Sequence, residues 1–324
     1  MWDIPCIEAV IGTENAKGVD TDFTVPSNDA RFYTKGVNVY TTKLALPNGA
    51  VTVRNSKMVA SPELLFLELA RKLSIHRLIL LGLQLCSHPQ GLPCDAITTK
   101  QKIAAFLAKT VGHRGHPKAI RALRFVENGS ASIMESLSYM ILVLPHALGG
   151  YGLSGAVFNH KIKLKGEARI RLGQDHCFVD LYYKYAKLGV EYDSYAYHSS
   201  PSELAKDAVR SAVLNRMGVK MLHLSTIQLY DRGACRDFAY ILAARLGKRI
   251  CIRAKKFNEM HTLLRELLPN KNSNADKLSD VDNLSNADKL SDADNLSDAD
   301  DRSNVDNLSD ADDLSDVDNL NEMV

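Results

Sequence analysis

The chain has 324 residues, with 40 Lys and Arg against 38 Asp and Glu and a formal net charge of +2. That length suffices for two modest domains and a tail. Because neither an apolar run of transmembrane length nor a signal-peptide pattern is found, we expect a cytoplasmic protein without a membrane partner. The six cysteines are scattered without the spacing of a disulfide framework, which predicts reduced thiols.

The small net charge hides two parts of opposite sign. Residues 274–324 carry 16 acidic and 3 basic side chains, a net charge of −13, and the remainder carries 37 basic and 22 acidic, a net charge of +15. A basic body suits DNA as a partner, because Lys and Arg displace the counterions condensed on phosphates. An ordinary solvated basic surface is the alternative.

Residues 1–128 are predicted to form an N-terminal region of short strands followed by helices. The β-branched residues at 37–40 and 51–53 predict strands around the turn Pro47-Asn48-Gly49. Ser61 followed by Pro62 is typical of a helix start. Helices are expected at 64–73, 99–110 and 117–125.

The next helix is predicted from a capping box. Ser132 is followed three residues later by Glu135, and the helix should end near Pro145. Glu135 therefore has two interpretations, a bond to the N-cap amide or a place in a metal site. One carboxylate can hardly do both.

Residues 129–250 then change to an alternation of strands and helices. A strand is expected at 158–164, and a hairpin joins strands at 177–183 and 189–193. A helix at 203–217, a strand at 219–224 and a helix at 227–246 follow. This order predicts an α/β fold with a mixed sheet flanked by helices, and a C-terminal helix and linker at 251–273.

The hairpin places Asp180 and Glu191 on neighbouring strands. Two carboxylates side by side are costly unless a hard divalent cation lies between them. Mg²⁺, or Mn²⁺ with similar preferences, takes one or two carboxylates together with water and substrate phosphate. The two acids are therefore predicted to hold a metal ion, as a phosphodiester hydrolase requires. A zinc site is a weaker alternative, because the cysteines lack knuckle spacing; its ligands would be Cys86, His88 and Cys94 with the pair His113 and His116.

Several acids and basic residues together resemble the DUF559 type of the very-short-patch-repair-like branch of the PD-(D/E)XK endonuclease superfamily, over about residues 130–245. The residues that carry the likeness are Glu135, Asp180, the triplet Glu191-Tyr192-Asp193, His198, and a helix with Asp207 and Arg210. Residues 50–130 are more loosely similar to the region that precedes this domain in AbiEi-antitoxin-like regulators. The resemblance implies a restriction-endonuclease-like sheet and a metal-dependent DNA endonuclease or nicking enzyme.

The resemblance also assigns roles. Asp180 and Glu191 would hold the metal, Glu135 would complete the site or position water, and His198 would assist as an acid or base. The resemblance further implies that Arg210 contacts phosphate, with Asp193 and Asp207 as supporting acids. The ordinary alternatives are an exposed loop histidine at 198 and a surface ion pair between 207 and 210.

Two residues depart from the pattern. Asp193 stands where the superfamily has a lysine, and Ser194 stands where the DUF559 type usually has glycine. Lys184 or Lys187 could replace the lysine only if the hairpin directs one of them at the metal. The competing function is a non-catalytic DNA-binding regulator of the antitoxin type that retains a nuclease-like fold.

The tail consists of eight tandem hexapeptides of the form [Asp/Asn]-[Ala/Val]-Asp-x-Leu-Ser between residues 274 and 321. A period of six fits neither a helix nor a strand, and the dense like charge predicts disorder. Calcium binding is disfavoured, because the glycine and terminal glutamate of the helix-loop-helix site are missing. We expect either an acidic arm that contacts the basic body or an inert expansion.

Deleting residues 274–324 should leave a folded protein that binds DNA more tightly. The gain should shrink as salt rises, because the acidic arm competes with phosphate only within a screening length of roughly 8 Å at physiological salt. Titration of both forms against one duplex at low and high salt measures this. Equal affinities at low salt would contradict the competition, and unfolding of the truncated form would contradict the predicted disorder.

Overall fold

A computed structural model of the protein describes residues 21–25, 29–31, 33, 37–41, 44–54, 57–89, 91, 93–193 and 201–269. For some of these, including 201–207, only the backbone is described. The repeat tail and His198 lie outside the described residues. Within these ranges, no helix combines the length and the apolar character needed to cross a bilayer.

The N-terminal region begins with two small two-stranded sheets. In the first, β1 (Thr21–Val25) pairs parallel with β2 (Val37–Thr41), and in the second, β3 (Val51–Arg54) pairs antiparallel with β4 (Lys57–Ala60). The helices that follow are α3 (Pro62–Leu69), α4 (Ile75–Leu85), the single turn η1 (Pro93–Asp95), α5 (Lys100–Ala108) and α6 (His116–Leu123). The expected strands and helices are present, but the first helix ends at Leu69 rather than at 73. Ser74 then caps α4, which was not predicted.

The second part alternates strands and helices. Its elements are α7 (Ile133–Val143), η2 (His146–Leu148), β5 (Ala156–Lys163), α8 (Glu167–Leu172), β6 (His176–Tyr183), η3 (Lys184–Ala186), β7 (Leu188–Asp193), α9 (Pro201–Arg216), β8 (Lys220–Ser225), α10 (Thr226–Tyr230), α11 (Arg232–Arg245) and α12 (Phe257–Arg265). The helix expected at 227–246 is in fact two helices. Asp231 separates them, because its extended backbone ends α10 and its side chain caps the Ala234 amide of α11.

One four-stranded sheet runs in the order β5-β6-β7-β8. β5, β6 and β7 are antiparallel neighbours, whereas β8 runs parallel to β7 after the crossover through α9. Helix α7 packs against β6 and β7, and α9 contacts β8. The predicted mixed sheet flanked by helices is confirmed.

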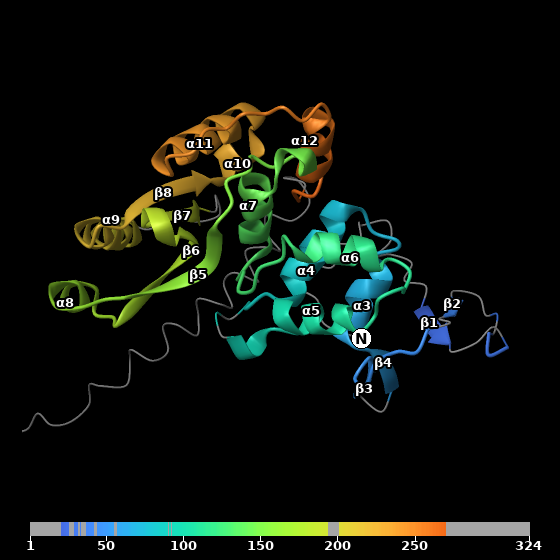
Figure 1. Ribbon diagram of the computed structural model, residues 1–324. Coiled ribbons are helices and arrows are strands. Elements are labelled where there is room, and N and C mark those ends of the chain that lie inside the picture. Colours follow the sequence, from blue (N-terminus) through green and yellow to red (C-terminus); the bar gives the residue numbers. More distant parts are fainter. Residues whose placement is uncertain are drawn as a thin grey trace, which may run out of the picture. The chain divides into compact units, whose positions relative to one another are not determined.

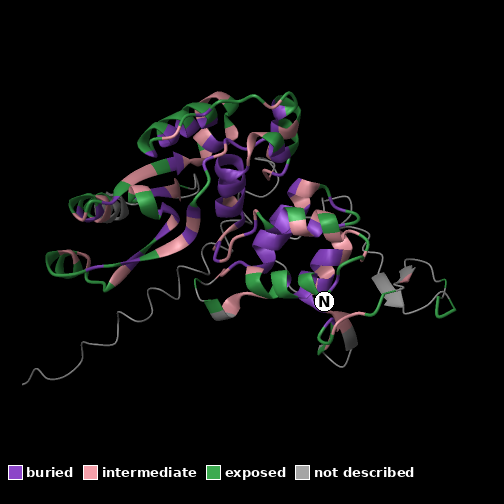
Figure 2. Ribbon diagram, in the orientation of Figure 1, coloured by how far each residue is buried: buried purple, intermediate pink, exposed green. Residues whose placement is uncertain are grey.

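Helix α7 is the centre of the described fold. All but one of its residues are buried, and Figure 2 shows it buried along its whole length. Figure 1 shows it between the sheet and the N-terminal helices, and it also contacts α4 and α12. A single hydrophobic cluster includes Leu78 of α4, Leu137 of α7 and Leu181 of β6. The boundary expected at residue 128 therefore lies within a continuous core.

Helix α12 completes this core from the C-terminal side. Phe257 and Leu264 are buried in the same cluster, and α12 packs on η2 and α7. A Cβ atom on Gly149, whose φ is +79°, would lie 2.4 Å from the His261 backbone nitrogen. His261 Nδ1 donates to the Gly149 carbonyl at 2.7 Å. The segment expected as a helix and linker thus contains a helix that belongs to the fold.

Candidate functional site

Strand β6 changes its orientation at Asp180. In a regular strand, alternate residues share one face. Leu181 and Tyr183 pack in the large core cluster, yet Cys177 and Val179 pack in a second, smaller cluster with α9. Asp180 therefore lies where the strand exchanges its two faces.

Strand β5 is distorted at the same level. Asn159 has a left-handed backbone with φ of +41°, which asparagine tolerates better than most residues. The ladder between β5 and β6 is continuous on both sides but omits the pair formed by Asn159 and Asp180. Asp180 is thus not paired with Asn159 in the regular ladder between β5 and β6.

The strands β6 and β7 part at the two predicted metal ligands. Their ladder ends at Leu181 and Val190, so Asp180 and Glu191 are the next residues to face each other. Instead of a main-chain bond, the Tyr192 amide donates to Asp180 Oδ2 at 2.9 Å. The hairpin prediction is confirmed, and it brings the two carboxylates to the same level of neighbouring strands.

Arg210 of α9 binds Glu191 with both ends of its guanidinium group. Nη2 lies 2.8 Å from Glu191 Oε1 and Nη1 lies 3.1 Å from Oε2. Nη2 also donates to the Phe178 carbonyl. The Glu191 side chain is only 13% exposed, so this bidentate pair is shielded from solvent and stronger than a surface ion pair.

The hairpin does not direct a lysine at the acids. Lys184 begins the η3 turn and Lys187 follows it, and both side chains are exposed. Lys184 is four positions from Asp180 along the chain, roughly 13 Å at the rise of a strand. The basic side chain at the site is therefore Arg210.

Glu135 is both a helix cap and a neighbour of the acid pair. Ser132 Oγ accepts from the Glu135 amide at 3.1 Å, as a capping box requires. The carboxylate accepts from Ser132 Oγ at 3.1 Å, from Asn159 Nδ2 at 2.8 Å and from the Ala131 amide at 2.9 Å. The carboxylate therefore binds the amide of Ala131, which precedes the N-cap residue Ser132, whereas we expected it to bind the amide of Ser132 itself.

Glu135 and Glu191 both act electrostatically on Asp180. Burial is the main cause that raises the pKa of Asp180 well above its usual range, and the charges of Glu135 and Glu191 raise it further. The Tyr192 amide and Arg210 oppose this effect. Burial likewise raises the pKa of Glu191, against the lowering effect of Arg210. Capping by Glu135 and proximity to the site, which seemed to compete, therefore coexist.

Two residues of this site were missed in the sequence. Asn159 links Glu135 to the Gly129 carbonyl, to which its Nδ2 donates at 2.8 Å. His223 of β8 is in register with Glu191, and its Nδ1 lies 3.3 Å from Asp193 Oδ2. The hydrogen bond of the same ring nitrogen to Asp193 Oδ1, at 3.5 Å, raises the pKa of His223, against the effect of burial. Both could have been noticed in the sequence, because Asn159 is a polar residue inside the strand predicted at 158–164 and His223 is one inside the strand predicted at 219–224.

Other predicted residues are not brought to the site by described contacts. His198 lies outside the described residues, and only the backbone of Asp207 is described, in α9. Cys86, a candidate zinc ligand, is fully buried in the core. Across the described ranges, no group of three or more His, Cys, Asp or Glu side chains could hold a metal ion.

Comparisons of the chain with models of known protein families, with curated proteins and with solved structures found no match. The functional argument therefore starts from the residues of the site.

Asp180→Asn should stabilise the metal-free protein. Because the pKa of Asp180 is higher in the folded protein than in the unfolded chain, the stability of the wild type falls as pH rises between the two values. Asparagine can still accept from Tyr192 and carries no charge. The free energy of unfolding should therefore rise, because the variant removes a carboxyl group whose ionisation the folded protein disfavours.

The gain should grow as pH rises from about 4, the unfolded pKa of aspartate, and vanish below it. Thermal or urea unfolding with EDTA present measures it. The exposed Asp175, paired with Arg169, provides the control Asp175→Asn, which should change stability little. A destabilised Asp180→Asn protein at neutral pH would contradict the assigned electrostatics.

Glu135→Gln and Glu135→Ala should differ sharply in stability. Glutamine keeps a carbonyl for Ala131 and Asn159, so its effect should be small. Alanine leaves the part-buried Ala131 amide without an acceptor and removes one of the two acceptors of Asn159 Nδ2, which costs about 1–3 kcal/mol. Urea unfolding of the two variants measures the difference. Equal stability of the two variants would show that the Glu135 carboxylate does not stabilise the start of α7.

Proposed function

We propose that the protein is a metal-dependent DNA endonuclease or nicking enzyme related to the restriction-endonuclease-like fold. The observation that carries the proposal is the convergence of Asp180 and Glu191 where β6 and β7 part, with Glu135 of α7 beside them. Partly buried carboxylates that repel one another are typical of functional sites, because a fold gains nothing from them by itself.

Asp180 and Glu191 would hold the metal, which we take to be Mg²⁺ or Mn²⁺. Their chemistry fits, since hard divalent cations take carboxylate oxygens. Asp180 Oδ2 is held by the Tyr192 amide, whereas Oδ1 accepts no hydrogen bond from the described residues. When bound, such an ion polarises a phosphoryl oxygen and lowers the pKa of water.

Arg210 would serve two partners in turn. It now neutralises Glu191, and its planar guanidinium group can equally bind a phosphate with two parallel hydrogen bonds. If Arg210 released Glu191 and bound a substrate phosphate instead, the Glu191 carboxylate would be free to bind the metal, and the phosphate would lie beside the metal. Glu135 and Asn159 would then fix the side of the site formed by α7 and β5. The body's net charge of +15 favours a polyanionic substrate.

A non-catalytic DNA-binding regulator is the second candidate. One observation favours it: both oxygens of Glu191 are bound by Arg210, and the carboxylate of Glu135 is held by Ala131, Ser132 and Asn159. In a regulator this network would be permanent. In a nuclease it must open when metal and DNA bind.

Asp180→Asn and Glu191→Gln should each abolish cleavage of a supercoiled plasmid in Mg²⁺ or Mn²⁺ while the fold is kept. Both changes remove a charge from the proposed metal site with little change in shape. His198→Ala should cause a milder loss, on the order of 10²–10⁴-fold. Gel assays of nicked and linear plasmid, with EDTA as a negative control, give the rates.

The matched control is again Asp175→Asn, an acid of the same type just before β6, which should cut at the wild-type rate. Cleavage by both site variants at that rate would show that the site is assigned wrongly. A wild-type protein that binds DNA but cuts with neither metal would favour the regulator. Calorimetric titration with Mn²⁺ gives an independent readout, since Asp180→Asn should weaken metal binding whether or not cleavage is seen.

A further inference from the structure

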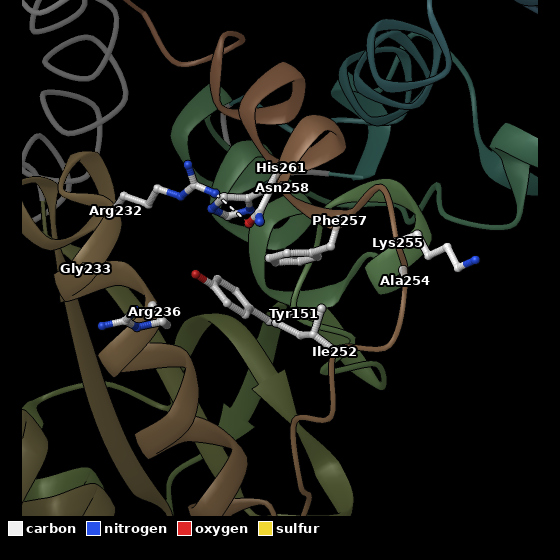
Figure 3. A pocket seen from close by; sticks show the side chains of 10 residues that line it. All are labelled: Tyr151, Arg232, Gly233, Arg236, Ile252, Ala254, Lys255, Phe257, Asn258 and His261. Carbon is white, nitrogen blue, oxygen red and sulfur yellow. Dashed lines mark hydrogen bonds between the residues drawn. The ribbon is translucent and has the colours of Figure 1, made fainter.

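A cavity of about 630 Å³ is lined by residues other than Glu135, Asp180 and Glu191, which are called the acid cluster below. Figure 3 shows the side chains that line this cavity. Its walls come from Tyr151, the first turn of α11 and the segment from Ile252 to His261 that leads into and includes the start of α12. The volume is within the range of roughly 300–1,000 Å³ that small-molecule sites have. None of its lining residues takes part in the site described above.

One side of the cavity is strongly basic. Arg232, Arg236 and Lys255 line it. Arg232 donates to the neutral Asn258 Oδ1 at 3.0 Å, and Arg236 has only a weak surface pair with Asp237 at 3.6 Å. In the described part of the chain, neither Arg232 nor Lys255 forms an ion pair. This side therefore carries positive charge that an anionic ligand can neutralise.

The same side holds backbone donors. Helix α11 is 14 residues long, and Asp231 Oδ1 accepts from the Ala234 amide in its first turn. The amides of Arg232 and Gly233, also in that turn, donate no hydrogen bond to the described residues. Free amides and the helix dipole favour an anion such as phosphate, although the nearby Asp231 carboxylate offsets part of the charge.

Tyr151 supplies an independent sign of a ligand. The Tyr151 residue is only 3% exposed, and its hydroxyl, which makes no hydrogen bond with any described residue, is not among the fully buried atoms and is open to the cavity. In Figure 3 the hydroxyl points to the side of the cavity that carries Arg232 and Arg236. A phosphate oxygen can therefore bond this hydroxyl. His261, which also lines the cavity, has a buried Nε2 without a hydrogen-bond partner among the described residues, and a buried polar atom of this kind is costly until a ligand or water satisfies it.

Another part of the lining is aromatic. The rings of Phe257 and His261 are stacked, with centroids 5.2 Å apart, and the Tyr151 ring lies 6.1 Å from that of Phe257. Ile252 adds an apolar edge. The face of an aromatic ring packs well against the ring of a nucleobase.

We propose that this cavity binds a nucleoside phosphate, with the phosphate on the side of Arg232, Arg236 and the Tyr151 hydroxyl and the base against the aromatic wall. The ligand is either a free nucleotide or the phosphorylated end of a nucleic acid strand. The proposal does not depend on cleavage at the acid cluster.

Isothermal titration of the full-length protein tests the ligand class. The probes are the four nucleoside 5′-monophosphates, adenosine, inorganic phosphate, and one single-stranded oligonucleotide with and without a 5′-phosphate. At least one nucleotide should bind about tenfold more tightly than adenosine or phosphate alone, or the phosphorylated oligonucleotide should bind about tenfold more tightly than its unphosphorylated form. Preference for the oligonucleotide identifies the strand end as the source. The proposal is wrong if inorganic phosphate binds as tightly as every nucleotide. It is also wrong if no nucleotide binds and the two oligonucleotides bind equally well with and without the 5′-phosphate.

Two variants test the assigned contacts. Tyr151→Phe removes only an unpaired hydroxyl, so the fold should be unaffected and affinity should fall about tenfold. Arg236→Gln removes an exposed charge and should weaken binding about 10- to 100-fold. Arg245→Gln, at the far end of the same helix, is the matched control and should bind as the wild type does. Wild-type affinity in both test variants, with unchanged melting temperatures, would place the ligand elsewhere.

Discussion

The hydrogen bond from the Tyr192 amide to Asp180 Oδ2 is the interaction on which the candidate site depends. It replaces a main-chain bond at the point where β6 and β7 separate, so a side chain rather than a carbonyl holds the two strands together there. Asp180 is thereby fixed beside β7 and opposite Glu191. The cost is negative charge gathered in a place with little water, which Arg210 offsets only in part.

Asn159 connects this arrangement to the rest of the molecule. Its left-handed backbone interrupts β5, and its side chain reaches both Gly129, at the end of the N-terminal region, and Glu135 in α7. A single amide therefore joins β5 to the start of α7 and to the residues just before it. A strained backbone of this kind persists only where its surroundings hold it.

Much of the sheet and one pair of site residues could be predicted from the sequence, because these depend on local patterns. Alternating apolar residues on either side of a short turn define the hairpin, and the hairpin alone brings Asp180 close to Glu191. Helix α4 was not predicted, because nine of its eleven residues are buried and the continuous apolar run from Leu78 to Leu81 obscures the spacing of its few polar residues. The pairing of Arg210 with Glu191 and the position of His223 beside Asp193 depend on how α9 and β8 return to the sheet. Such contacts between distant segments leave no periodic trace in the sequence.

The close fit of α12 against Gly149 has a consequence for how the protein is made. Ribosomes add residues from the N-terminus, and N-terminal parts generally begin to fold during synthesis. Here the core around α7 lacks Phe257 and Leu264 until the last described helix has been synthesised. A nascent chain that has already formed its sheet still exposes the apolar side of η2 and α7. Closure of the core is therefore among the last steps of biogenesis, and a message truncated before residue 257 encodes a product with an open core.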